Sequence, residues 1–158
     1  MDTYKVFTLD LYSVNDRNFA DIALQVFHFQ AENNSVYREY LSHLRLSIDA
    51  VRHVTDIPCL PISFFKEHLV KTGAWVAEAN FITSGTGGQK SGIHAVKRLD
   101  FYLTHTERCF EFFFGDIQQY HFLALLPSYL ERRDSSLVAM VDHFIKKSRS
   151  NFSGFYLH

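Results

Sequence analysis

The chain has 158 residues, a length that suits one domain better than two of full size. Hydrophobic residues make up 47% of it and charged residues 21%, which excludes an intrinsically disordered chain. Sixteen basic residues stand against 17 acidic ones, so the sequence lacks the basic surplus of a nucleic-acid-binding protein. The longest strongly apolar run, 122–126, is too short to span a membrane.

The first 17 residues contain no basic segment followed by an apolar stretch, so we expect no secretory signal. Two cysteines without such a signal, Cys59 and Cys109, favour free thiols in a reducing compartment. We therefore expect a cytoplasmic protein in which both cysteines are buried as small apolar residues.

We expect residues 1–57 to be mostly helical. Apolar side chains recur at helical spacing over 19–30, and Ser13 and Asn15 precede them as candidate caps. After two asparagines the same spacing returns over 36–44, which predicts a second helix.

A third and shorter helical pattern covers 48–57 and stops at Pro58. The following stretch, 57–62, contains two prolines, each of which lacks an amide donor and restricts the residue before it. We expect this stretch to be an extended and largely buried connector.

Residues 58–158 have the mixed pattern of an α/β region. Short strands are predicted over 65–71 and 79–83, and a third over 93–96. Four of the seven glycines lie in the segment 84–92 between the last two, so we expect that segment to be the loop of a hairpin.

Further along, a helix is predicted over 99–113 with Gly115 ending it, and a buried strand over 120–126. Ser135 or Ser136 is expected to cap a last helix. The inward-facing residues of this last helix are expected to be Leu137, Met140, Val141, Phe144 and Ile145.

A final strand is predicted over 155–157, one residue before the sequence ends. This pattern fits either an edge strand of a single domain spanning 1–158 or the N-terminal fragment of a longer protein. We expect the three consecutive aromatic residues 112–114 to lie in the core, although a fragment would expose part of them.

The glycine-rich segment has an evident chemical use. Glycines allow successive backbone N–H groups to converge on one point, where the hydroxyls of Thr83, Ser84 and Thr86 and the cation Lys90 could join them around a phosphate. A surface turn of small residues is an equally weighted alternative. A Walker A loop, and with it a P-loop nucleotidase, is disfavoured because its two glycines would fall at Ser84 and Gln89.

The stretch Phe81-Ile82-Thr83-Ser84-Gly85-Thr86-Gly87-Gly88 resembles the phosphate-binding signature Thr-Ser-Gly-Thr-Thr-Gly of adenylate-forming enzymes, with glycine in place of one threonine. The chain as a whole resembles the N-terminal portion of the acyl-protein synthetase (LuxE) family. Several further stretches carry that resemblance in the same order: 29–34, 57–66, 125–132, 135–138 and 154–157.

The resemblance implies part of the large α/β N-terminal domain of adenylate-forming enzymes. It also implies ATP-dependent activation of a carboxylic acid, most simply a fatty acid, and transfer of the acyl group to a thiol. The ATP phosphates would be held by Thr83, Ser84, Gly85, Thr86, Gly87, Gly88 and Lys90. A weaker assignment places Pro127, Ser128 and Tyr129 at the acyl or carboxylate pocket. The implied cofactor is ATP with Mg²⁺, and the implied protein partners are an acyl-carrier or reductase protein and the C-terminal region.

Besides Gly87, this chain departs from the family pattern in two further ways. The lysine of the loop is displaced by one position. This chain also lacks the arginine that relatives often carry near Gly92, which removes one cation from the phosphate site. The ribose-binding acid, the catalytic lysine and the acylated cysteine would all lie beyond position 158. We therefore assign no catalytic residue and expect the chain alone to be inactive. The alternative function is a non-catalytic protein that binds a nucleotide, an acyl group or a protein partner.

No protein-bound metal is predicted. His105 and Cys109 stand four residues apart and would share a helix face, but two ligands fall short of the four of a structural zinc site. His94, which follows the loop closely, could contact a phosphate, but a position on the surface of the hairpin is the favoured interpretation.

Overall fold

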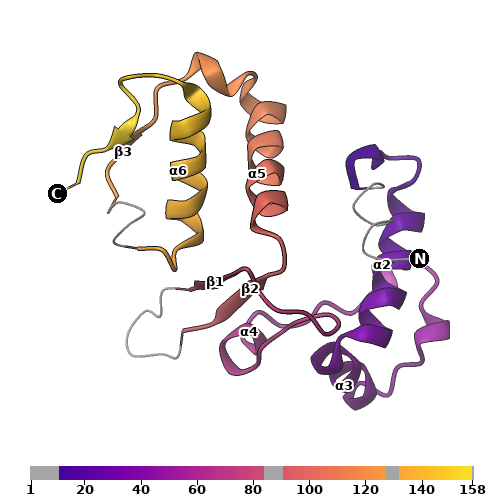
Figure 1. Ribbon diagram of the computed structural model, residues 1–158. Helices are drawn as coiled ribbons and strands as arrows, with labels where there is room; N and C mark the ends of the chain where they lie inside the picture. Colours follow the sequence, from indigo (N-terminus) through magenta and orange to yellow (C-terminus); the bar gives the residue numbers. More distant parts are fainter. Residues whose placement is uncertain (1–10, 84–90, 127–131, 158) are drawn as a thin grey trace. The chain divides into compact units, whose positions relative to one another are not determined.

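The computed structural model describes residues 11–83, 91–126 and 132–157 (Figure 1). The described residues form a mixed α/β protein with five α-helices and two small two-stranded sheets, which confirms the α/β class expected from the sequence. None of their helices has the length and apolar character that crossing a membrane would require. The chain divides into two compact units: Met1–Phe64 with Val70–Ala74, and Phe65–Leu69 with Trp75–His158.

The first unit is built on two helices, α2 (Phe19–Asn33) and α3 (Ser35–His43), as the helical spacing predicts. The predicted caps of α2 are wrong by several residues. Its N-cap is Asn18, and the side chain of Asn18 accepts a hydrogen bond from the amide of Asn15 at 2.7 Å instead of capping the helix. The apolar faces of both helices meet in a small core of Phe27, Ala31, Tyr37, Leu41 and Val51.

The corner between α2 and α3 is held by hydrogen bonds. The buried side chain of Asn34 accepts from the amide of Tyr37 at 3.1 Å, which caps α3, and donates to Thr72 Oγ1 at 3.1 Å. Thr72 in turn donates to the side chain of Gln30. The amide of Gly73 donates to the backbone carbonyl of Asn33 at 2.9 Å. The corner and the segment Val70–Ala74 are thereby tied together.

The third predicted helix of this unit does not form. Its place is taken by two single 3₁₀ turns, Ile48–Ala50 and Val54–Asp56. The apolar residues of this stretch recur every three positions, which is the period of a 3₁₀ helix and not of an α-helix.

The connector 57–62 contains no helix or strand, as its prolines predict, but it is not largely buried. Cys59 and Ile62 are both exposed, so the expectation of a buried cysteine is wrong at this position. The predicted strand over 65–71 is also wrong, because the short helix α4 (Phe64–Glu67) occupies its start. The amide of Phe64 donates to the carbonyl of Pro61 at 3.0 Å, and this local bond begins the helical turn.

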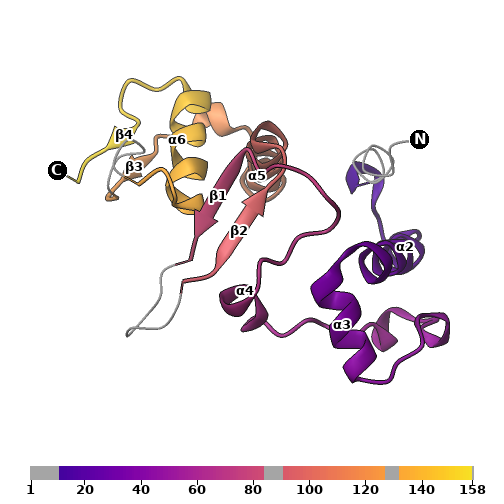
Figure 2. The same cartoon turned by 60° about the horizontal axis from the view of Figure 1, so that its bottom comes forward.

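The second unit contains the predicted hairpin. Strands β1 (Ala79–Ile82) and β2 (Ile93–Val96) pair antiparallel, with Ala79 opposite Val96 and Ile82 opposite Ile93 (Figure 2). Phe81 and Val96 point into a core that they share with Ala139 and the partly buried ring of Tyr102.

Two long helices, α5 (Leu99–Phe114) and α6 (Ser136–Ser148), lie side by side and run in the same direction (Figure 1). Gly115 ends α5 at a φ of +83°, and Ser135 caps α6 by accepting from the amide of Val138, both as predicted. Phe110 contacts Tyr120, Phe122 and Phe144 at ring-centroid distances of 5.2, 5.4 and 5.2 Å. We call these four residues the aromatic cluster.

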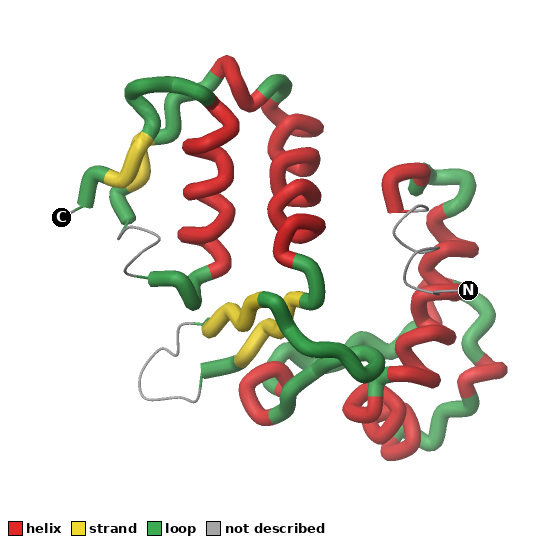
Figure 3. The backbone as a smooth tube through the Cα atoms, in the orientation of Figure 1, coloured by secondary structure: helices red, strands yellow, loops and turns green. Residues whose placement is uncertain are grey.

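Strands β3 (Leu123–Ala124) and β4 (Gly154–Phe155) pair in parallel on the far side of α6 from α5, and α6 connects them (Figure 3). The predicted buried strand over 120–126 is therefore much shorter than expected. Only alternate residues are covered: Ala124 is buried, whereas Leu123 and Leu125 are exposed. A two-stranded sheet with a helix on one face leaves its other face open, which accounts for the alternation.

Some residues expected in the core are exposed. Phe112 and Phe113 are 83% and 75% exposed, and Phe114 and Cys109 are also exposed. Three consecutive helical residues span about 200° of the helix circumference, so they cannot all face one neighbouring helix. Leu137 is likewise exposed, because α6 buries Val138 and Ala139 at that end.

Candidate functional site

The glycine-rich segment joins the two strands of the hairpin. β1 ends at Ile82 and β2 begins at Ile93, so residues 83–92 form the connection. Six of the predicted phosphate-binding residues lie outside the described residues: Ser84, Gly85, Thr86, Gly87, Gly88 and Lys90. The described part of the candidate site is its base, formed by Thr83 and Gly92.

Thr83 and Gly92 close the base of the loop with two firm hydrogen bonds. The amide of Thr83 donates to the carbonyl oxygen of Gly92 at 2.9 Å, and the amide of Gly92 donates to Thr83 Oγ1 at 2.8 Å. The Thr83 hydroxyl also donates a hydrogen bond to the Gly92 carbonyl oxygen at 3.4 Å. The hydroxyl of Thr83, expected to face a phosphate, is therefore engaged with the other end of the loop.

Gly92 has a steric role that sequence reasoning missed. A Cβ atom at this position would lie 2.5 Å from the backbone oxygen of Phe65, closer than real Cβ contacts allow. It would also lie 3.1 Å from Thr83 Oγ1. A residue with a side chain at position 92 would push the loop base away from the segment that begins at Phe65. The sequence signal was only the unusual density of glycines.

The base of the loop is also tied to the turn that precedes α6. The amide of Ile82 donates to the carbonyl of Asp134 at 2.8 Å, one residue before the cap Ser135. Beneath this point Phe81 packs its ring 5.3 Å from that of Tyr102. These contacts connect the base of the loop to the turn before α6 and to α5.

His94 follows the loop on β2 and is exposed, as predicted for the surface of the hairpin. Its ring lies 6.4 Å from Phe81 and 6.2 Å from Tyr102, measured between centroids. An imidazole is therefore held on the hairpin two residues after Gly92, as a further polar group near the candidate site.

The weaker predicted pocket residues, Pro127, Ser128 and Tyr129, lie outside the described residues. They belong to the segment that follows β3 and precedes α6. Of the described residues that flank the two predicted site segments, Ile82 and Asp134 are joined by the hydrogen bond given above.

A partly buried ion cluster lies between α5 and α6, away from the loop in sequence. Glu107 Oε2 is 2.7 Å from His143 Nε2 and 3.2 Å from Lys147 Nζ, and the Glu107 and His143 side chains are each 16% exposed. Burial alone would raise the pKa of Glu107, but the hydrogen bonds from His143 and Lys147 outweigh it and lower this pKa. Sequence spacing could not reveal this cluster because it joins residues 36 positions apart.

In the first unit the hydroxyl of Tyr37 donates to the carbonyl of Pro58 at 2.6 Å. Burial, with smaller contributions from Cys59 and Tyr40, raises the pKa of Tyr37 to about 12. Tyr37 therefore stays protonated across the physiological range and acts as a structural donor.

In the described residues, few side chains that could bind a metal lie close together. Over the described ranges no group of three or more His, Cys, Asp or Glu side chains is arranged to hold a metal ion. His105 and Cys109 do meet on α5, with 3.7 Å between Nε2 and Sγ.

The fold and the loop define a mixed α/β protein with a glycine-rich hairpin connection that is firmly anchored at its base. Comparison with protein-family models, curated proteins and solved structures gives no match.

Proposed function

We propose that this protein takes part in the ATP-dependent activation of a carboxylic acid, with a fatty acid as the first candidate substrate. The acid would be converted to an acyl-adenylate, and the acyl group would then pass to a thiol. The chain would act as the N-terminal part of an enzyme similar to acyl-protein synthetases.

The observation that carries the proposal is the Thr83–Gly92 closure beneath the signature-like segment. A phosphate-binding loop needs several backbone N–H groups directed at one point, and a fixed base limits the conformations from which that array must form. The two hydrogen bonds across the base and the bond from Ile82 to Asp134 supply such a base.

The engagement of Thr83 refines the proposed roles. Its side chain is used at the base, so the phosphate donors would be the backbone amides and hydroxyls of residues 84–88, with Lys90 as the cation. Departure of pyrophosphate builds up negative charge, which fixed donors stabilise without having to reorganise. Mg²⁺ would accompany the ATP as part of the substrate.

The test has two readouts. Binding of Mg²⁺-ATP is measured by calorimetry on the 158-residue chain, and fatty-acid-dependent exchange of pyrophosphate into ATP is measured on the protein isolated from its native cells. We expect Gly85→Val to abolish both signals with an unchanged circular dichroism spectrum, because a β-branched residue restricts the backbone.

Gly154→Ala is the matched control, because a Cβ atom at Gly154 would meet only ordinary contacts with Tyr156, at 3.7 Å and beyond. Exchange that survives Gly85→Val would contradict the loop assignment. ATP binding without any exchange in the native protein would favour the non-catalytic binding function. Phosphate release that needs no acid would favour a nucleotidase.

A further inference from the structure

The sheet of β3 and β4 is covered on one face only. In its parallel register Leu123 is paired with Gly154, and Ala124 with Phe155. Paired residues project from the same face of a sheet, and successive residues along a strand project from opposite faces. Ala124 is buried and Phe155 is half-buried, so this pair marks the covered face. The other face, which we call the open face, is made of Leu123, Leu125, Gly154 and Tyr156.

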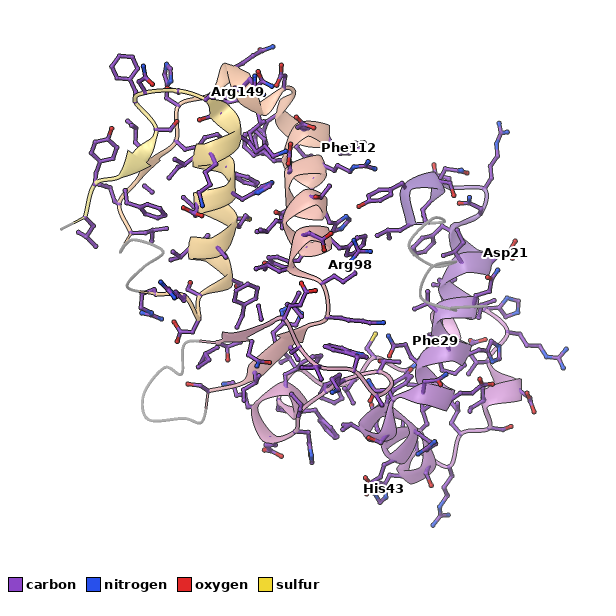
Figure 4. All side chains as sticks on the ribbon, viewed as in Figure 1. Asp21, Phe29, His43, Arg98, Phe112 and Arg149 are labelled. Atoms are coloured by element: carbon purple, nitrogen blue, oxygen red, sulfur yellow. The ribbon has the colours of Figure 1, made fainter. Side chains whose placement is uncertain are left out.

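The open face is apolar and uncharged, although parallel sheets occur almost only with both faces covered. The exposed fractions of its large side chains are 64%, 74% and 51%, for Leu123, Leu125 and Tyr156. The stretches 120–126 and 152–157 contain no lysine, arginine, aspartate or glutamate. The charged residue that precedes β4 most closely in the sequence is Arg149, at the C-terminal end of α6 (Figure 4). Charge complementarity therefore requires a partner that is uncharged where it meets the sheet.

The outer edge of β3 offers backbone groups for pairing. The bonds to β4 use the carbonyl oxygens of Phe122 and Ala124, which accept at 2.9 and 2.8 Å. The peptide groups of Leu123 and Leu125 therefore point away from β4, and none of the described residues forms a hydrogen bond with them. Natural sheet edges are commonly protected by lysine, proline or a bulge. The stretch 120–126 contains neither lysine nor proline, so nothing in it opposes a further strand.

The size of the open face fits one added strand. Complete burial of its three large side chains would cover no more than about 600 Å², taking for each the roughly 200 Å² of a whole aromatic side chain. Each partner in a stable dimer contributes about 800 Å², so this face is too small to hold a second copy. A lipid or another small apolar molecule would cover the side chains but leave the peptide groups of Leu123 and Leu125 unpaired. An extended peptide satisfies both requirements.

We propose that the open face and the outer edge of β3 bind an extended, uncharged segment of another protein, which adds a third strand to this sheet. The backbone of the segment pairs with the peptide groups of Leu123 and Leu125. Its alternate side chains are apolar and lie on the open face beside these leucines. Binding involves no covalent step and does not depend on the proposed acyl activation.

The experiment measures amide hydrogen exchange by nuclear magnetic resonance on the full 158-residue chain. The probe is a synthetic peptide of about eight residues in which threonine and valine alternate, long enough for one strand. We expect the amides of Leu123 and Leu125 to exchange at least about 10-fold more slowly at saturating peptide. The amide of Phe155, which points to the opposite edge of the sheet, should be unaffected. Unchanged exchange at both leucines would overturn the proposal.

Two variants separate the open face from other exposed apolar residues. Leu123→Lys places a charge on the open face and should weaken peptide binding by at least about 10-fold. Leu44→Lys is the matched control, because Leu44 is a 49% exposed leucine of the first unit, and it should leave binding unchanged. Both variants should keep the circular dichroism spectrum of the parent chain, since both side chains are exposed.

A second probe tests the role of the backbone. The same peptide with all its amides N-methylated keeps the side chains but cannot donate hydrogen bonds, so it should not bind. Equal binding of the methylated peptide would show that the edge of β3 plays no part and would overturn the proposal. So would a dimer, seen by sedimentation of the parent chain without peptide and absent in Leu123→Lys, because a second copy would then occupy the open face.

Discussion

The two compact units are held together by different interactions. In the first, Ala31 at the centre of the core has no exposed surface, and the neighbouring corner is fixed by the hydrogen bonds of Asn34, Thr72 and Gln30. In the second, the helices α5 and α6 are joined by aromatic rings around Phe110 and by a partly buried ion cluster at Glu107.

The difference shows that two kinds of interaction contribute differently to the structure. Hydrogen bonds are directional, so a few of them define the angle and register of a corner that buries little area. Aromatic side chains each bury a large area but leave more freedom in how they meet. We therefore expect truncation in the second unit to cost more stability, and loss of a polar group in the first to disturb local geometry.

The largest effect is expected from Phe144→Ala. Phe144 is 6% exposed and contacts both Phe110 and Phe122, so its removal should lower the free energy of unfolding by about 3–5 kcal/mol. Urea unfolding followed by circular dichroism measures the loss. Leu137→Ala on the same helix, where the side chain is 49% exposed, should cost no more than about 1 kcal/mol. Equal losses would contradict the importance of the aromatic cluster.

Substitution of either of two glycines of the second unit by alanine should lower the free energy of unfolding, for a different reason at each position. Gly92→Ala places a Cβ against the carbonyl of Phe65, and Gly115→Ala forces a side chain into a backbone conformation at φ +83° that has open space around it. Each should cost about 1–3 kcal/mol. Only Gly92→Ala should also weaken Mg²⁺-ATP binding, because only Gly92 belongs to the loop base. Equal ATP affinity in the two variants would show that the loop base does not contribute to nucleotide binding.

In the first unit, Asn34→Ala should lower the free energy of unfolding by about 1–2 kcal/mol, through loss of the cap of α3 and of the bond to Thr72. The adjacent Asn33→Ala removes only an exposed hydrogen bond to the carbonyl of Phe29 and should change stability by less than about 0.5 kcal/mol. Amide hydrogen exchange should quicken at Tyr37 in the first variant and not in the second. If Asn33→Ala costs as much as Asn34→Ala, the corner network is not what stabilises this unit.

The smallest expected effect on stability comes from protonation of Glu107 at acidic pH. The pKa of Glu107 is lowered in the folded protein from its ordinary value of 4.5, so its ion pairs stabilise the fold above that pH. This contribution should disappear as the pH falls below about 4.5 towards the folded pKa. Glu107→Gln should flatten the stability curve in that acidic range.

Asp142→Asn is the matched charge control for this pH experiment. It removes a carboxylate from α6 whose partner, Lys146, is 70% exposed. The acidic part of the stability curve should change less in this variant than in Glu107→Gln. A curve that Glu107→Gln leaves unaltered would show that the Glu107 cluster contributes nothing to the second unit.

Local patterns in the sequence determined much of the fold. Helical spacing located α2, α3, α5 and α6, and turn chemistry located the hairpin with its glycine-rich connection. The sequence predicts Gly115 as the end of one helix and Ser135 or Ser136 as the cap of another, and the structure selects Ser135, because these roles depend on local backbone geometry. The candidate loop could be found for the same reason, since a dense run of glycines and hydroxyls is a local feature.

Tertiary structure decided what local patterns could not. The exposure of Phe112 and Phe113 depends on which face of α5 meets α6, and the shortness of β3 depends on its having a single partner strand. The approach of Phe65 to Gly92 and the cluster at Glu107 join residues far apart along the chain, and the Thr83 side chain bonds across the loop in a way that its sequence does not specify. A sequence records the spacing within each element, whereas contacts of this kind arise only when separate elements pack together.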